Sequence, residues 1–135
     1  MSNLVIVDTD VWSEAFRKVK GEPSPELKFL RELVSDSRVQ MVGCVRQEVL
    51  QGMKRAEVFE RVREQLRSFP DREVKTDEYE LAAEFFNTCR SKGIQGSSTD
   101  FLICACGVSW GLPILTKDKD FSLYAQHLPI KLVRV

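Results

Sequence analysis

The segment Leu4-Val5-Ile6-Val7-Asp8-Thr9-Asp10 places four consecutive apolar residues directly before two acids. Three of the four are β-branched, and an uninterrupted run of this kind is typical of a strand buried on both faces, as at the centre of a parallel sheet. In open α/β sheets, ligands bind in the crevice beyond the carboxyl ends of the strands. An acid in that position is therefore a candidate for catalysis or metal binding, although it can also serve as the N-cap of a following helix.

The composition is that of one domain spanning residues 1–135. Apolar residues make up 43% and charged residues 30% of the chain, which is typical of a soluble globular protein. No apolar run is long enough for a membrane span, and the N-terminus does not resemble a signal peptide, so we expect a cytoplasmic protein without a membrane partner. Lysine plus arginine balance aspartate plus glutamate at 20 each. Any binding to nucleic acid must therefore come from a local patch or a metal site.

The cysteines do not form a zinc-binding pattern. None of Cys44, Cys89, Cys104 and Cys106 belongs to a Cys-x-x-Cys pair, and the only histidine, His127, has no cysteine near it in sequence. Three of the four lie among apolar residues, where a free thiol packs as a small hydrophobic group. We therefore expect free cysteines in a reducing compartment.

Strand and helix patterns alternate along the chain. Strands are predicted at residues 4–7, 39–44, 113–115 and 130–133, with a short edge strand at 73–75. Helices are predicted at residues 11–17, 25–35, 45–51, 56–69, 77–89, 101–106 and 123–126, the first of them capped by Asp10. This alternation predicts an α/β fold with a mainly parallel central sheet flanked by helices.

Four acids occupy positions that such a sheet brings together. Asp8 and Asp118 follow two of the predicted strands, and Glu48 lies one turn into the helix that follows a third. Asp100 lies at the start of the most apolar helix. Clustered carboxylates repel one another, and a divalent cation removes that conflict. A site made only of oxygen ligands suits Mg²⁺ or Mn²⁺.

Each acid also has a structural interpretation. We favour Asp10 as a helix cap over a metal ligand. Asp100 could complement the positive end of its helix, and Asp118 and Asp120 could be turn residues. Glu48 could be an ordinary exposed glutamate. From spacing alone, a metal-dependent acidic site and these structural roles remain equally open.

Four segments resemble the signature motifs of the PIN domain family. They are Val7-Asp8-Thr9-Asp10-Val11-Trp12, Glu48-Val-Leu-Gln-Gly52, Asp100-Phe-Leu-Ile-Cys-Ala105 and Leu115-Thr-Lys-Asp-Lys-Asp-Phe121. Each motif is weak alone, but together they occur in the family's order and span the chain at the family's length. Within the family, the chain is most similar to the VapC-type toxins of toxin–antitoxin pairs.

This resemblance implies a single Rossmann-like domain and a metal-dependent endoribonuclease that cleaves RNA phosphodiesters with an activated water. It implies that Asp8, Glu48, Asp100 and Asp118 are the catalytic acids. It further implies that Asp8, Asp100 and Asp118 hold Mg²⁺ or Mn²⁺ and that Thr116 forms a hydrogen bond within the site. Expected partners are structured RNA such as tRNA or ribosomal RNA, a cognate antitoxin protein and a second copy in a homodimer.

The chain departs from the family pattern at two motifs. Cys104-Ala-Cys106 replaces residues that are usually alanines, and many relatives carry asparagine at the position of Asp118. This leaves open whether Asp118 or Asp120 completes the site. We favour Asp118 because it is nearer to the strand end, with Asp120 and Asp10 as supporting acids. The positive candidates for contacting RNA are Arg17, Lys18, Lys117 and Lys119, and no sequence feature selects among them.

Three other functions fit parts of the sequence. The chain could be a PIN nuclease in housekeeping RNA processing, or a PIN domain that binds RNA or protein without catalysis. The presence of all four acids argues against the non-catalytic interpretation. A phosphatase or a receiver-like α/β protein with Asp8 as phospho-acceptor is a further alternative.

Overall fold

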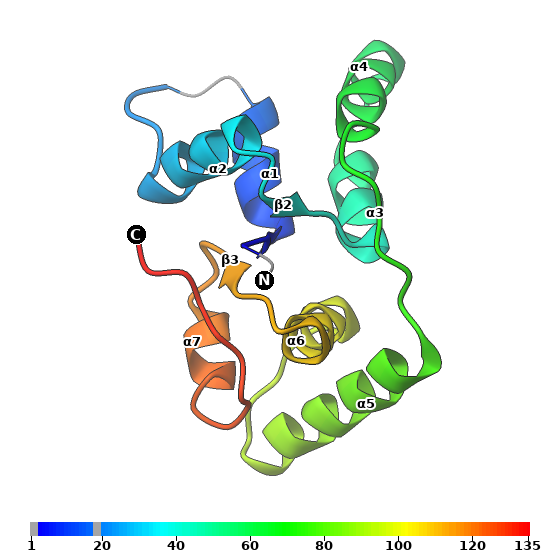
Figure 1. Ribbon diagram of the computed structural model, residues 1–135, viewed down its shortest axis with the longest axis vertical. Coiled ribbons are helices and arrows are strands. Elements are labelled where there is room, and N and C mark those ends of the chain that lie inside the picture. The colour runs from blue at the N-terminus through cyan, green and yellow to red at the C-terminus, as the bar shows by residue number, and fades with distance from the viewer. Residues whose placement is uncertain (1–2, 18–19) are drawn as a thin grey trace.

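The computed structural model describes residues 3–17 and 20–135. Three short strands, β1 (Val5–Val7), β2 (Val39–Gln40) and β3 (Ile114–Leu115), form a parallel sheet in the order β2-β1-β3. The helices of the described residues are α1 (Thr9–Phe16), α2 (Pro25–Ser35), α3 (Gly43–Gln51), α4 (Ala56–Leu66), α5 (Thr76–Ser91), α6 (Ser98–Trp110) and α7 (Asp120–Tyr124). Figure 1 shows α1 and α2 above the strands and α5 and α6 below them. The predicted α/β fold with a parallel sheet flanked by helices is confirmed.

The central strand is β1, which pairs in parallel with both of its neighbours. Val5 pairs with Val39 of β2, and Val7 pairs with Leu115 of β3. The three residues of β1 are at most 2% exposed, as predicted for a strand buried on both faces. Because both pairings are parallel, all three strands end at the same edge of the sheet.

The second strand is shorter than predicted. A strand was expected over residues 39–44, but β2 ends at Gln40 and α3 begins at Gly43. Val42 and Val45 are buried at the start of this helix instead. A short apolar run does not distinguish a strand from a buried helix segment by periodicity alone, which explains the error.

The predicted last strand and edge strand also differ from the structure. Residues 130–133 contribute only an isolated parallel bridge between Leu132 and Ile114. Residues 73–75 form no strand. The sheet therefore has fewer regular strands than the apolar runs suggested.

Five helices begin one to three residues earlier than predicted: α1, α3, α5, α6 and α7. Three of these changes affect the acids, because α6 starts at Ser98 and takes Asp100 into its first turn, and α1 and α7 also start beside acids. Helix α1 starts at Thr9, so its N-cap is Asp8, and the prediction that Asp10 is the cap was wrong. Asp10 lies instead in the first turn. The helix predicted at residues 123–126 is α7, which begins at Asp120.

Helix α6 forms the centre of the core beside β3. Its buried residues are Phe101, Ile103, Cys104, Ala105, Cys106 and Gly107. A Cβ atom at Gly107 would lie 3.2 Å from Ile114 Cδ1, so glycine lets the helix approach the strand closely. All four cysteines are free and three are buried, which agrees with their predicted packing role. No helix in residues 3–17 and 20–135 combines the length and apolar character needed to cross a membrane.

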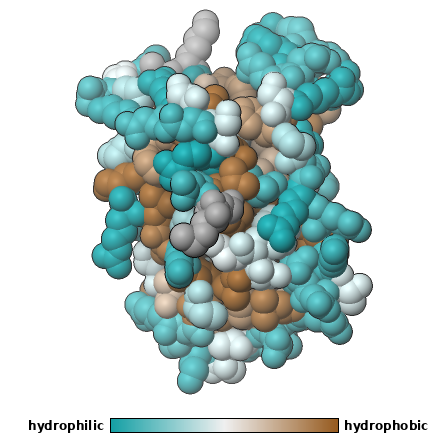
Figure 2. All heavy atoms as spheres, in the orientation of Figure 1, coloured by the Kyte–Doolittle hydropathy of each residue, from teal (hydrophilic) through white to brown (hydrophobic). Residues whose placement is uncertain are grey.

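On the face drawn in Figure 2, hydrophobic side chains reach the surface mainly in the middle of the molecule, and hydrophilic side chains cover its upper and lower ends.

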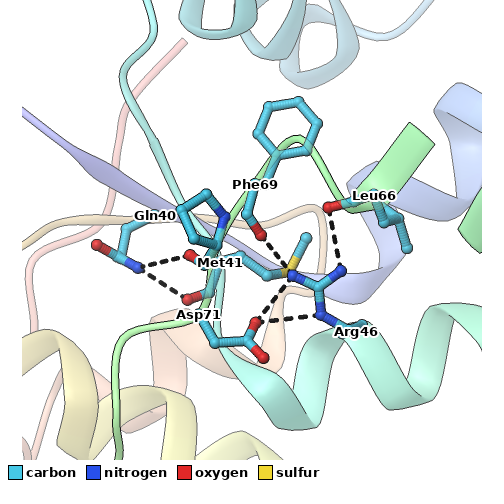
Figure 3. A network of polar contacts seen from close by, with 7 residues as sticks. Gln40, Met41, Arg46, Leu66, Phe69 and Asp71 are labelled. Carbon is cyan, nitrogen blue, oxygen red and sulfur yellow. Dashed lines mark hydrogen bonds and ion pairs between the residues drawn. The ribbon is translucent and has the colours of Figure 1, made fainter. Parts of the chain in front are cut away.

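Arg46 on α3 anchors the segment that follows α4 (Figure 3). Its guanidinium donates hydrogen bonds to the carbonyl oxygens of Leu66, at 3.0 Å, and Phe69, and pairs with the Asp71 carboxylate at 3.0 Å. Because α3 also carries Glu48, this network holds the helix that presents that acid to the carboxyl edge of the sheet.

Candidate functional site

Asp8 lies at the carboxyl end of the central strand and is 6% exposed. Its backbone N–H donates to the carbonyl oxygen of Leu115 at 2.8 Å, so the pairing between β1 and β3 continues up to this residue. One carboxylate oxygen accepts the Thr9 N–H at 2.8 Å, and the other accepts the Thr116 hydroxyl at 2.6 Å. The capping role and a place in an acidic cluster therefore coexist in one residue.

Two further acids each accept a hydrogen bond from a hydroxyl group. The Thr9 hydroxyl donates to Glu48 Oε1 at 2.7 Å and thereby joins α1 to α3. The Tyr124 hydroxyl donates to Asp100 Oδ2 at 2.8 Å and joins α7 to α6. The sequence analysis missed both donors, because nothing in the local sequence indicates that they lie beside these acids.

The loop that follows β3 brings Asp118 to the same edge. The Thr116 hydroxyl, which donates to Asp8, accepts the backbone N–H of Asp118 at 3.0 Å. Asp118 Oδ1 accepts the N–H of Asp120 at 2.9 Å, which starts α7. Both oxygens of Asp10 accept the N–H of Lys117, at 3.3 and 3.2 Å. Asp10 therefore holds this loop against α1.

Burial raises the pKa of Asp8 from its ordinary value of 3.8 to about 7. The negative charges of Asp10 and Asp100 add to this increase. The hydrogen bonds from Thr116 and Thr9 oppose it, but they do not outweigh the loss of solvation. A large fraction of the Asp8 side chains is therefore protonated near neutral pH when no cation is bound.

The pKa values of two neighbouring acids rise for similar reasons. Burial raises the pKa of Asp10, and the charge of Asp118 contributes to the rise. Burial also raises the pKa of Asp100, with further contributions from the charges of Asp118 and Glu48. Acids from four separate segments are thus close enough to influence one another electrostatically.

The donor chemistry of the cluster fits a hard divalent cation. All of its acidic groups are carboxylates, several are partly buried, and their mutual repulsion is the type of conflict that a cation relieves. In residues 3–17 and 20–135, however, no three histidine, cysteine, aspartate or glutamate side chains converge closely enough to hold a metal ion as they stand. The oxygen ligands of the carboxylates suit such an ion, but the carboxylates lie farther apart than in a metal-bound site.

A polar cleft of about 440 Å³ is lined by one acid of the cluster, Asp118, and by Glu26 of α2. Thr116 also forms part of its lining, together with the cationic side chains of Lys119 and Arg134. Lys117 also lines the cleft, but its ammonium group lies 3.0 Å from a carboxylate oxygen of the buried Glu14.

The four predicted RNA contacts are therefore not equivalent. Lys117 is engaged by Glu14, whereas Lys119 is exposed beside the acids. Arg17 is the C-cap of α1, and Lys18 lies outside the described residues. The sequence analysis did not identify Arg134, which comes close to the acids only through the pairing of Leu132 with Ile114.

A second, more apolar cavity of about 430 Å³ lies between α5 and α6. Its lining residues are Tyr79, Ala82, Ala83, Phe86, Asn87, Ser98, Thr99, Phe101 and Leu102. This lining contains no carboxylate, so the cavity is separate in character from the acidic cluster.

Comparison with known proteins identifies a family match over most of the chain. The family model of the PIN domain matches residues 5–126. No curated protein sequence gives a significant match.

Several solved structures have the same fold as this chain. FitAcB from Neisseria gonorrhoeae has a TM-score of 0.74 at 16% sequence identity, covering 97% of both chains. VapBC2 from Rickettsia felis, bound to a DNA fragment from its promoter, has a TM-score of 0.77 at 15% identity, covering 96% of this chain and 97% of that one. VapBC-5 from Mycobacterium tuberculosis has a TM-score of 0.69 at 18% identity, covering 98% and 99%. At these identities the similarity shows the fold.

We predict that replacing Asp8 with asparagine stabilises the metal-free fold at pH 8 but not at pH 4. The pKa of Asp8 is about 7 in the folded chain against 3.8 ordinarily, so its ionisation costs folding free energy as the pH rises between these values, and the full cost remains above pH 7. One pKa unit corresponds to about 1.4 kcal/mol. Because an asparagine oxygen accepts weaker hydrogen bonds than a carboxylate, we expect a net gain of about 1–3 kcal/mol in urea unfolding with EDTA at pH 8.

Asp120→Asn is the matched control, because Asp120 is exposed and should change the free energy of unfolding little at either pH. A gain for Asp8→Asn that is equal at pH 4 and pH 8 would exclude ionisation of Asp8 as its cause.

Proposed function

We propose that this chain, which belongs to the PIN domain family, is a metal-dependent endoribonuclease and the VapC-type toxin of a type II toxin–antitoxin pair. The observation that carries the proposal is the cluster of buried and partly buried acids at the carboxyl edge of the parallel sheet. We take the PIN domain to extend over residues 1–135, beyond the 5–126 that the family model matches. We also place the protein in the cytoplasm, where its proposed substrate is found.

We assign the metal ligands to Asp8, Asp100 and Asp118, and the cation to Mg²⁺ or Mn²⁺. Each of these aspartates comes from a different segment, and their charges act on one another. When bound, such a cation would activate a water molecule and neutralise charge on the phosphodiester. Glu48 is the fourth catalytic acid, and we assign to it the acceptance of a proton from the attacking water.

The surrounding hydroxyl and amide groups orient these acids. Thr116 and the Thr9 amide each hold one oxygen of Asp8, so its carboxylate cannot rotate freely. The Thr9 hydroxyl donates to one oxygen of Glu48, Oε1, at 2.7 Å. Asp10 is a supporting residue, because both of its oxygens accept the Lys117 amide and keep the following loop in place.

We favour Asp118 over Asp120 as the acid that the segment after β3 contributes to the site. The backbone N–H of Asp118 donates to the Thr116 hydroxyl, which itself donates to Asp8. The charge of the Asp118 carboxylate contributes to the raised pKa values of Asp10 and Asp100. Asp120 is an exposed residue in the first turn of α7. Its supporting role is to donate its backbone N–H to Asp118.

We propose that RNA, such as tRNA or ribosomal RNA, approaches along the polar cleft. Lys119 and Arg134 are exposed there next to Asp118 and carry the charge that phosphate groups require. We assign a lesser role to Lys117, because Glu14 already neutralises it. Arg17 and Lys18 remain candidates for more distant contacts.

Support for the toxin role comes from the structures with the same fold. VapBC-5 is a member of the VapBC family of toxin–antitoxin systems, and VapBC2 was solved on promoter DNA. By this likeness we propose that a cognate antitoxin protein binds and inhibits the chain, and that the active protein is a homodimer.

Purified protein is expected to cleave total tRNA or ribosomal RNA with Mg²⁺ or Mn²⁺ and not with EDTA. Asp8→Asn and Asp118→Asn should each remove a proposed ligand. Loss of an outer-shell partner of a metal costs roughly 10–100-fold, so loss of a ligand should reduce the cleavage rate by at least this factor. Gel analysis of the RNA products measures the rate.

The control for this assay is Asp120→Asn, which should remain active. An inactive Asp120→Asn together with an active Asp118→Asn would move the assignment to Asp120. A folded wild-type protein that cleaves no RNA and gives no calorimetric signal with Mn²⁺ would contradict the nuclease proposal.

The double variant Lys119→Ala/Arg134→Ala is expected to bind RNA more weakly with little change in kcat. Each lost phosphate contact should reduce the slope of log affinity against log salt concentration by about 1. Titration of a labelled RNA at several salt concentrations measures this slope. Lys92→Ala is the matched control, because Lys92 is exposed at the end of α5, and an unchanged slope in the double variant would remove the cleft from the substrate path.

Induced expression in a bacterial host is expected to arrest growth if the chain is a toxin. Asp8→Asn should be harmless, and co-expression of a small protein encoded beside the gene should restore growth and co-purify with the chain. Growth curves and affinity purification provide the readout. Harmless expression of an enzyme that is active in vitro would favour a housekeeping nuclease instead.

A further inference from the structure

Tyr124 places a phenol hydroxyl against one of the proposed metal ligands. The chain has two tyrosines: Tyr124 is 0% exposed, whereas Tyr79 is 57% exposed. The Tyr124 ring packs against Phe101, with ring centroids 4.8 Å apart, and against Phe121, with centroids 5.2 Å apart. Its hydroxyl donates to Asp100 Oδ2 at 2.8 Å. A deeply buried aromatic side chain therefore ends on an acid of the cluster.

The backbone makes room for the tip of this side chain at Gly96. A Cβ atom at Gly96 would lie 2.3 Å from the Tyr124 hydroxyl oxygen and 2.8 Å from its Cζ atom, which is too close for any side chain. The φ angle of Gly96 is not positive, so backbone conformation alone does not require glycine there. Glycine is required at position 96 because the phenol group of Tyr124 fills the volume that a side chain there would occupy.

Tyr124 also connects two acids that come from different segments. It is the last residue of α7, and the N–H of Asp120 at the start of this helix donates to Asp118 Oδ1 at 2.9 Å. At its other end, α7 presents the Tyr124 hydroxyl to Asp100. A short helix thus links the carboxylates of Asp118 and Asp100 through one hydrogen bond at each end.

We propose that Tyr124 is a positioning residue of the metal centre, which orients the Asp100 carboxylate and keeps it in a fixed relation to Asp118. This inference rests on the proposed function, because it assumes that both aspartates bind the cation. Hydrogen bonds from outer-shell groups orient metal ligands, and their loss typically weakens metal binding by about 10–100-fold. A hydroxyl that served only to fill the core would not have this effect.

Tyr124→Phe tests the proposal because it removes the hydroxyl and retains the ring. We expect the Kd for Mn²⁺, measured by calorimetry, to rise about 10-fold or more. Tyr79→Phe should leave this Kd unchanged. Ile103→Val is a second control, because it weakens the core on the same helix as Asp100 without removing the hydrogen bond. Unfolding temperatures in EDTA show whether Tyr124→Phe and Ile103→Val are comparably destabilised.

A spectroscopic measurement on the unmutated chain does not depend on how the variant folds. Incorporation of 3-fluorotyrosine gives two ¹⁹F resonances, which Tyr79→Phe assigns by removing one of them. We expect addition of Mg²⁺ to shift the Tyr124 resonance and to leave that of Tyr79 in place. If Tyr124→Phe does not fold, this shift supports the proposal and its absence overturns it.

The outcomes separate this inference from the proposed function. If the wild-type chain and Tyr124→Phe bind Mn²⁺ with equal Kd, the positioning role is overturned and the nuclease proposal stands. If the wild-type chain binds neither Mn²⁺ nor Mg²⁺, both are overturned.

Discussion

Parallel pairing of β1 with β3 is the constraint on which the acidic cluster depends. The ladder extends through the bond from the Asp8 N–H to the Leu115 carbonyl oxygen, so Asp8 and Thr116 leave the sheet side by side and their side chains form a 2.6 Å hydrogen bond. Slipping the register by one residue would turn the side chains of a strand to the opposite face. Every residue of β1 and β3 is buried, so after such a slip the packing on both faces of the strands, including the Ile6–Ile114 pair, would have to change. The packing of the core thereby determines the geometry of the site.

The cluster works against the stability of the fold that holds it. Burial and mutual repulsion raise the pKa of Asp8, Asp10 and Asp100, so their ionisation is unfavourable in the metal-free protein. The hydroxyl groups around them offset part of this cost, because each donates a hydrogen bond to a carboxylate. Buried acidic groups of this kind are expected mainly at functional sites, and the remainder of the fold provides the stability that offsets their cost.

Local sequence patterns identified the central strand and the parallel sheet, but they overestimated the number and length of the strands and did not reveal the contacts around the acids. The buried strand before Asp8 is visible in the sequence because four apolar residues are consecutive. The cap of α1 was predicted two residues late, since Asp8 and Asp10 are both suitable caps and only the helix start distinguishes them. The bonds of Thr9 to Glu48 and of Tyr124 to Asp100 join residues 39 and 24 positions apart. Such pairs depend on tertiary packing, so propensity and periodicity cannot identify them.

The distances along the chain between these partners also affect when the site can exist during folding. The bond between Thr116 and Asp8 closes a loop of 108 positions, and contacts of such long range form late because the chain loses entropy before they can stabilise it. A partly folded chain would hold individual helices with separated, ordinary carboxylates. The cluster is consequently a property of the complete native topology, and its appearance would follow the cooperative folding transition rather than the formation of any single segment.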